Sequence, residues 1–198
     1  MTGMDGMQLV GVRTDKIATG IRGLDSMLKG GFQEGSVNLI TGGPGSGKTL
    51  LSAHFLFHGA QRGEAGIYVS LEDSPKQIIK TCSDFNLDIK RYTDSGLLTF
   101  VDASPFEGHY GEGTFLVAND DPHAFNSDTL LDILKRFGNR KIKRVVFDPI
   151  TMLTSQFRNP LKLREQLLKL TKMLSAARYT AVLTAEIENE NGNNYTPE

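Results

Sequence analysis

The segment from Gly42 to Thr49, GGPGSGKT, constrains the fold more than any other part of the chain. This glycine loop fits the pattern G-x-x-x-x-G-K-[ST], and it lies between an apolar strand-like run, Val37 to Thr41, and a helix predicted from Gly47 to Gln61. Glycine lets such a loop curl until successive backbone N–H groups point inward at phosphate oxygens. The alternative is a chance match in a glycine-rich turn. The flanking strand and helix argue against it, because a phosphate-binding loop requires that context.

Strands and helices alternate along the rest of the chain. Strands are predicted at 67–71, 97–102, 144–147 and 180–184, and helices around 24–28, at 75–85, at 128–137 and from Asn159 onward. Residues 103–127 are polar and rich in glycine, and they are predicted to be a long irregular connection. The alternation predicts an α/β fold, a three-layer sandwich with a mainly parallel sheet covered by helices on both faces.

Length and composition indicate one domain with an unstructured segment at each end. The 198 residues suit a single domain. Residues 1–16 are predicted to be a flexible lead-in, residues 17–187 the folded domain, and residues 188–198 a polar, disordered tail. The lone cysteine, Cys82, cannot form an internal disulfide, and neither a membrane-spanning run nor a signal peptide is present. We therefore expect a cytoplasmic protein without a membrane segment.

The charge balance gives no reason to expect nucleic acid as a partner. The chain has 22 basic and 23 acidic residues, so no large positive field surrounds it. The longest basic cluster comprises Arg140, Lys141, Lys143 and Arg144. We interpret this cluster as a solvated loop before a buried strand.

Each residue type in the glycine loop suits one part of a nucleotide triphosphate. The compact charge of Lys48 suits the β and γ phosphates, and the Thr49 hydroxyl suits Mg²⁺. The following helix directs its positive N-terminal end at the same anion. ATP and Mg²⁺ are the expected cofactors. The predicted nucleotide-binding residues are Gly43, Pro44, Gly45, Ser46, Gly47, Lys48, Thr49 and Leu50.

Acidic residues follow two of the predicted strands. Asp148 ends the run RVVFD and is the predicted metal ligand, although Asp102 also ends a strand and remains an alternative. Glu72 and Asp73 follow strand 67–71, at the sheet edge where open α/β folds bind ligands. A carboxylate there can orient a water for hydrolysis. The alternative is a simple helix cap, which Ser74 already supplies.

Three segments together resemble the RecA-like ATPases and, among them, the KaiC-like group. They are TGIRGLDSMLKGGFQEGSVNLITGGPGSGKTL, YVSLEDSPKQIIK and RVVFDPIT, within a similarity that covers residues 17–187. The resemblance implies a RecA-like P-loop NTPase core in which Glu72, with Asp73 beside it, supplies the hydrolytic carboxylate and Lys48 assists. It also implies that Asp148 is the metal-binding aspartate.

The resemblance further implies a homo-oligomer, a hexameric ring in which a neighbour's basic residue reaches the γ phosphate. The sequence departs from the group at Pro149, which stands where the group usually has serine, and residues 103–127 look longer than their counterpart in the group. The group's distal strands are expected to be missing, which leaves Arg178 as the candidate basic residue.

We therefore expect an ATP-binding, slowly hydrolysing KaiC-like ATPase that acts through self-assembly or a regulatory protein partner. A RecA/RadA-type DNA-dependent ATPase is one alternative, but residues 187–198, where such proteins bind DNA, contain neither lysine nor arginine. A non-hydrolytic nucleotide switch is another. The sequence does not decide whether autokinase activity exists.

Overall fold

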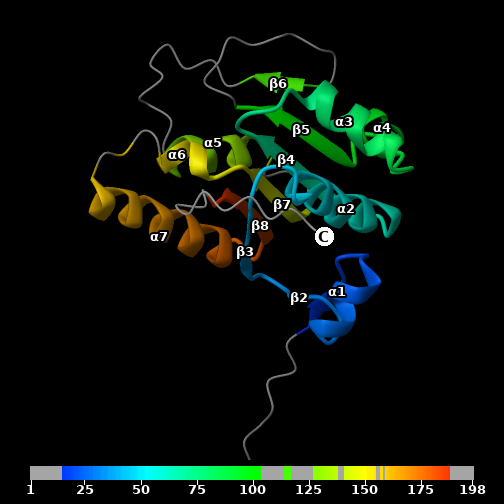
Figure 1. The fold of residues 1–198 in the computed structure, drawn as a ribbon, viewed down its shortest axis with the longest axis horizontal. Coiled ribbons are helices and arrows are strands. Elements are labelled where there is room, and N and C mark those ends of the chain that lie inside the picture. The colour runs from blue at the N-terminus through cyan, green and yellow to red at the C-terminus, as the bar shows by residue number, and fades with distance from the viewer. Residues whose placement is uncertain are drawn as a thin grey trace, which may run out of the picture.

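A single parallel sheet forms the centre of the computed structural model, with strands in the order β3-β8-β7-β4-β5-β6 (Figure 1). The structure describes residues 15–103, 114–116, 127–137, 141–154, 157 and 159–187. The predicted tail at 188–198 and nearly all of the predicted lead-in lie outside these residues, as does most of the irregular connection. Within that connection the structure adds one strand that the sequence did not predict, β6 (Thr114–Leu116), at the sheet edge.

The strands of the sheet all run in the same direction. They are β3 (Val37–Gly42), β4 (Ala65–Ser70), β5 (Leu98–Asp102), β6, β7 (Ile142–Asp148) and β8 (Thr180–Glu186). Every neighbouring pair is parallel. The carboxyl ends of these strands therefore meet at one edge of the sheet, where ligands of open α/β folds bind. A separate antiparallel pair, β1 (Lys16–Ile17) and β2 (Phe32–Gln33), precedes the sheet.

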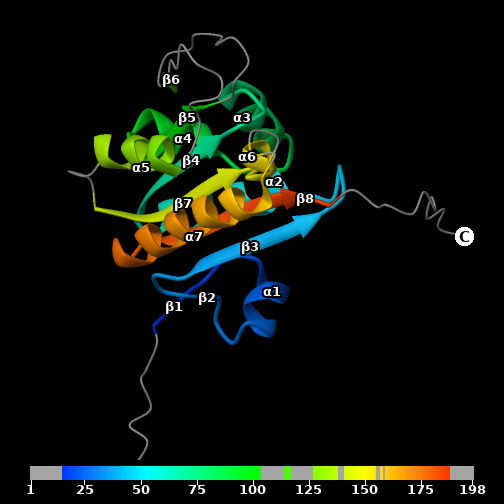
Figure 2. The same ribbon diagram turned by 90° about the vertical axis from the view of Figure 1, so that its left-hand side faces the viewer.

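Helices cover both faces, as Figure 2 shows. Helices α2 (Lys48–Gln61), α3 (Pro75–Asp84) and α4 (Ile89–Asp94) share one apolar core with one face of the sheet and with the β1–β2 pair. On the opposite face the core is formed with α5 (Ser127–Arg136) and α7 (Pro160–Ala176). Two short helices, α1 (Arg22–Met27) and α6 (Thr151–Thr154), also lie among the described residues. The predicted three-layer α/β sandwich is confirmed.

Strand β7 shows why both faces are covered. Val146 belongs to the core on the α2 side, whereas Val145 and Phe147 belong to the core on the α5 and α7 side. Successive side chains of a strand point to opposite faces, so a strand that is apolar throughout needs a helical layer on each side. None of the helices in the described ranges is both long and apolar enough to cross a membrane.

The long helices were predicted closely. Ser74 accepts a hydrogen bond from the backbone N–H of Gln77 at the start of α3, and Asn159 accepts one from that of Leu161 at the start of α7. Both contacts are N-caps at helix starts that the sequence predicted. The sequence did not predict α4, α6 or the β1–β2 pair. Each of them has six residues or fewer, too few to establish a hydrophobic period.

The interpretation of Arg144 as part of a solvated loop was wrong, because it is among the largest fully buried side chains. Its Nε donates a hydrogen bond to Glu64 at 2.7 Å, and its Nη1 donates to the carbonyl oxygens of Ala18 and Phe55 at 2.8 Å each. The guanidinium also lies over the Phe55 ring, 4.6 Å from its centroid. Arg144 therefore joins β7, α2 and the segment before α1. Its neighbour Lys143 is exposed, as predicted.

Replacing Arg144 by methionine should destabilise the fold, because Glu64 would keep its charge in a largely buried position without a partner. We expect the free energy of unfolding to fall by about 2–4 kcal/mol, somewhat below the loss for a fully buried pair. Denaturant unfolding measures it. Lys143→Met, on the same strand but exposed, is the matched control and should change stability by less than about 0.5 kcal/mol. Equal stabilities of the two variants would contradict a structural role for Arg144.

Candidate functional site

The glycine loop connects β3 directly to α2. Gly45 and Gly47 have φ values of +71° and +86°, in the left-handed region that favours glycine. Gly47 is also the residue that caps α2, and no side chain occupies the capping position. The first backbone N–H groups of this 14-residue helix therefore remain available to an anion.

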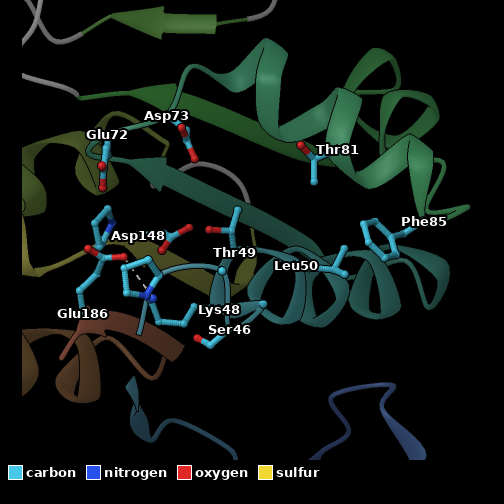
Figure 3. Close-up of a pocket in the computed structure, with 14 residues that line it drawn as sticks. Ser46, Lys48, Thr49, Leu50, Glu72, Asp73, Thr81, Phe85, Asp148 and Glu186 are labelled. Atoms are coloured by element: carbon cyan, nitrogen blue, oxygen red, sulfur yellow. Dashed lines mark hydrogen bonds and ion pairs between the residues drawn. The ribbon is translucent and has the colours of Figure 1, made fainter. Parts of the chain in front are cut away.

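A pocket of about 370 Å³ opens above the glycine loop (Figure 3). Residues from the loop, from the ends of β4, β7 and β8, and from α3 form its walls. They are Pro44, Gly45, Ser46, Gly47, Lys48, Thr49, Leu50, Glu72, Asp73, Thr81, Phe85, Asp148, Pro149 and Glu186. The structure thus brings nearly all of the predicted site residues to one place. Gly43 is not a lining residue, although its carbonyl oxygen contacts Lys48. Asp102, the alternative metal ligand, does not line the pocket either.

Lys48 has a hydrogen-bond acceptor for each of its three ammonium protons. Its Nζ donates to the carbonyl oxygens of Gly42 and Gly43 at 3.0 and 2.9 Å, and to Glu186 Oε1 at 3.3 Å. The side chain is 8% exposed, so these contacts stabilise a buried charge. A phosphate oxygen can bind this amine only in place of one of them. The bond to Glu186 is the longest of the three, and the Glu186 side chain is 42% exposed.

Asp148 is held by hydroxyl groups on both flanking strands. Tyr68 on β4 donates a hydrogen bond to its Oδ2, and Thr184 on β8 donates one to its Oδ1. Burial and the charge of Asp148 raise the pKa of Tyr68 well above its ordinary value, so the phenol stays protonated and donates. Figure 3 shows Thr49 beside the Asp148 carboxylate.

Thr49 and Asp148 form an oxygen donor set that suits Mg²⁺. Magnesium prefers hard oxygen ligands and is usually held by one or two carboxylates together with phosphates and water. Among the described residues, no group of three or more His, Cys, Asp or Glu side chains could hold a metal ion by itself.

Glu72 and Asp73 lie just beyond β4 and face the pocket (Figure 3). Removal from water raises the pKa of Glu72, and the charges of Glu186, Asp73 and Asp148 raise it further. The pKa of Asp73 is raised by burial and by Asp148. A raised pKa makes the ionised carboxylate a stronger base, which favours proton abstraction from water. Glu72 and Asp73 both have a raised pKa, so either carboxylate could act as this base.

The sequence did not indicate several residues of the site. Glu186 ends β8, so the strand-end rule that selected Asp148 could have selected it too. Thr81 and Phe85 line the pocket from α3 and the residue that follows it. No local pattern distinguishes these two from other surface residues of an amphipathic helix. Tyr68 and Thr184 read as ordinary buried strand residues, and only the fold places them on Asp148.

Comparison with known families gives one consistent result. The family model for the KaiC ATPase matches residues 17–198. A UPF0273 protein of Pyrococcus furiosus is 34% identical over 174 residues, which cover 87% of this chain and 68% of that protein. The circadian clock oscillator protein KaiC of a Nostoc species is 34% identical over 180 residues, which cover 90% of this chain but 33% of that protein.

The fold is similar to that of a solved relative. The crystal structure of a KaiC-like protein from Pyrococcus horikoshii superposes with a TM-score of 0.71 at 32% sequence identity. The superposition covers 88% of this chain and 73% of the other. Sequence and fold therefore point to the same family.

Replacing Glu186 by glutamine should tighten the binding of ATP, because Glu186 competes with phosphate for Lys48 and repels the anion. We expect roughly 2- to 10-fold higher affinity, the range for losing a partly exposed ion pair. Calorimetric titration measures it. Asp94→Asn makes the same change of net charge at an exposed pair with Lys90 on α4 and serves as the control. Weaker binding in Glu186→Gln would instead make Glu186 a nucleotide contact.

Proposed function

Because this chain belongs to the KaiC family of RecA-like ATPases, we propose that it binds ATP with Mg²⁺ in the pocket above the glycine loop and hydrolyses it slowly. One observation carries the proposal. The glycine loop, Lys48, Thr49, Asp148 and Glu72, which come from three different strand ends, line a single pocket.

The phosphates bind where the backbone and Lys48 concentrate positive charge. The N-terminal turn of α2 offers N–H groups and the positive end of the helix dipole. Lys48 adds the single cationic side chain among the residues that line the pocket, and it would exchange its bond to Glu186 for a phosphate oxygen. A bound Mg²⁺ would neutralise phosphate charge, with Thr49 and Asp148 as its protein ligands.

Hydrolysis requires a water aligned with the γ phosphate and a base that accepts its proton. Glu72 is our candidate for this base. It lies across the pocket from Lys48 and is exposed enough to meet solvent, and its pKa is raised by its surroundings. Asp73 is the neighbouring alternative.

The nucleobase would lie toward α3. Phe85 and Thr81 line that side of the pocket, together with Leu50 on α2 (Figure 3). Phe85 is 59% exposed, which is unusual for a large apolar side chain and suits an aromatic surface against which a base can stack. Leu50 and Phe85 offer no side-chain hydrogen bond to a base edge. The Thr81 hydroxyl can both donate and accept, so it does not by itself select one base.

We further propose that the output is conformational, through self-assembly into a ring or through a regulatory protein. Support comes from the family, whose members include circadian clock proteins much longer than this chain. A slow rate is expected unless a neighbouring subunit supplies a basic residue to the γ phosphate.

Replacing Glu72 by glutamine should leave ATP affinity nearly unchanged and reduce turnover by at least ~100-fold, the lower range for removing a positioned base. The wild-type rate should fall as the pH drops through the raised pKa of Glu72, and the variant should lose this acid limb. Calorimetry and phosphate release measure the two quantities. Asp73→Asn is the matched control. If the two variants exchange phenotypes, Asp73 is the base.

Wild-type protein that binds ATP tightly without any phosphate release would contradict hydrolysis and favour a non-hydrolytic nucleotide switch. Stimulation of the rate by single-stranded DNA at a stated salt concentration would favour the DNA-dependent alternative.

A further inference from the structure

Tyr68 and Thr184 occupy both oxygens of the Asp148 carboxylate. Tyr68 donates to Oδ2 from β4, and Thr184 donates to Oδ1 from β8, the strands on either side of β7. Tyr68 and Thr184 are 0% exposed, and Asp148 is 5% exposed. A carboxylate has about four lone-pair sites, so two remain available to a metal ion or its waters.

The position of Tyr68 follows from the register of the sheet. Tyr68 pairs with Val146, two residues before Asp148, so all three side chains project from the same face. The phenol therefore runs along the sheet toward its carboxyl edge, where its hydroxyl reaches Asp148. The ring is stacked on Phe100 at 5.2 Å, with 14° between the ring planes. Packing on β5 thus holds the hydroxyl in place.

The side chains around the Tyr68 ring are apolar, whereas its hydroxyl end meets polar groups. Val146 and Val182 lie on the same face beside Tyr68, and Ala53 of α2 belongs to the same core. A phenylalanine would fill the same space without bringing a polar atom that needs a partner. The hydroxyl therefore adds little to packing. Its polar contacts are with Asp148, to which it donates, and with the Thr49 side chain, so it meets both of the proposed metal ligands.

We propose that Tyr68 is a positioning residue for the metal site: with Thr184 it fixes the rotation of the Asp148 carboxylate so that its free lone pairs face the ion that Thr49 binds. This inference rests on the proposed function, because it assigns Mg²⁺ to Thr49 and Asp148. Fixing a ligand in advance reduces the ordering that binding must otherwise impose, and hydrogen-bonding partners of metal ligands commonly change metal affinity by ~10–100-fold.

A purely structural role makes a different prediction. If Asp148 only satisfies the buried phenol, then deleting the hydroxyl changes stability and leaves the Mg²⁺ dependence unaltered. If Tyr68 positions Asp148, the deletion raises the Mg²⁺ concentration needed for tight nucleotide binding. Binding of nucleotide without metal depends on the glycine loop and stays the same in both cases.

The test is Tyr68→Phe, which removes one oxygen atom and keeps the stacked ring. We expect calorimetric titration of ATP at a series of Mg²⁺ concentrations to show a midpoint at least ~10-fold higher than in the wild type, with unchanged affinity in EDTA. Tyr92→Phe is the matched control, since Tyr92 lies on α4, packs edge-to-face on Phe57 at 5.7 Å and does not line the pocket. Thermal unfolding verifies that each variant is folded.

An unchanged Mg²⁺ midpoint in folded Tyr68→Phe would overturn the proposal. Thr184→Val deletes the other hydroxyl with little change of shape, and we expect it to raise the midpoint as well. It provides the test if Tyr68→Phe does not fold, and failure of both variants to fold would overturn the proposal by assigning the hydroxyls to stability. Wild-type protein that binds no ATP even with Mg²⁺ would refute the proposed function itself, and this result is distinct from an unshifted midpoint.

Discussion

The parallel pairing of β8 with both β3 and β7 is the constraint on which the site depends. Val37 to Gly42 of β3 pair with Ala181 to Glu186 of β8, and β7 pairs with the other side of β8. This ladder brings three strand ends together, which carry the glycine loop, Asp148 and Glu186. Because β3 and β7 lie on either side of β8 and neighbouring strands are ~4.8 Å apart, the loop and Asp148 are separated by roughly two strand spacings.

Electrostatics then determine what the pocket can hold. Four carboxylates line it, those of Glu72, Asp73, Asp148 and Glu186, against the single lysine Lys48. Such a pocket disfavours a bare polyanion, and it suits one that arrives with a divalent cation. The backbone N–H groups at the start of α2 add positive potential, although they carry no formal charge. We therefore propose that the acidic walls, Glu186 in particular, make nucleotide binding depend on Mg²⁺.

Helices that are long enough to show a hydrophobic repeat, or that begin with a clear N-cap signal, could be predicted from the sequence. Ser74 with Pro75, and Asn159 with Pro160, mark helix starts through chemistry confined to neighbouring residues, and both helices begin there. Arg144 shows the opposite case. Its membership of a basic run indicated solvent, whereas its environment is set by Glu64 and by backbone carbonyls from α2 and from the segment before α1. Contacts between residues 80 or more positions apart leave no local pattern.

The sequence by itself determined the loop chemistry, because the glycines, Lys48 and Thr49 act within eight consecutive residues whose geometry is local. It also determined the α/β class, because segments with the hydrophobic pattern of strands alternate along the chain with segments that have the hydrophobic repeat of helices. Only the tertiary structure decided that Asp148 and not Asp102 lines the pocket, that Glu186 pairs with Lys48, and that Tyr68 and Thr184 hold Asp148. The physical reason is strand order: β8 is the last strand of the described residues but lies between β3 and β7, and no local rule states which strands become neighbours.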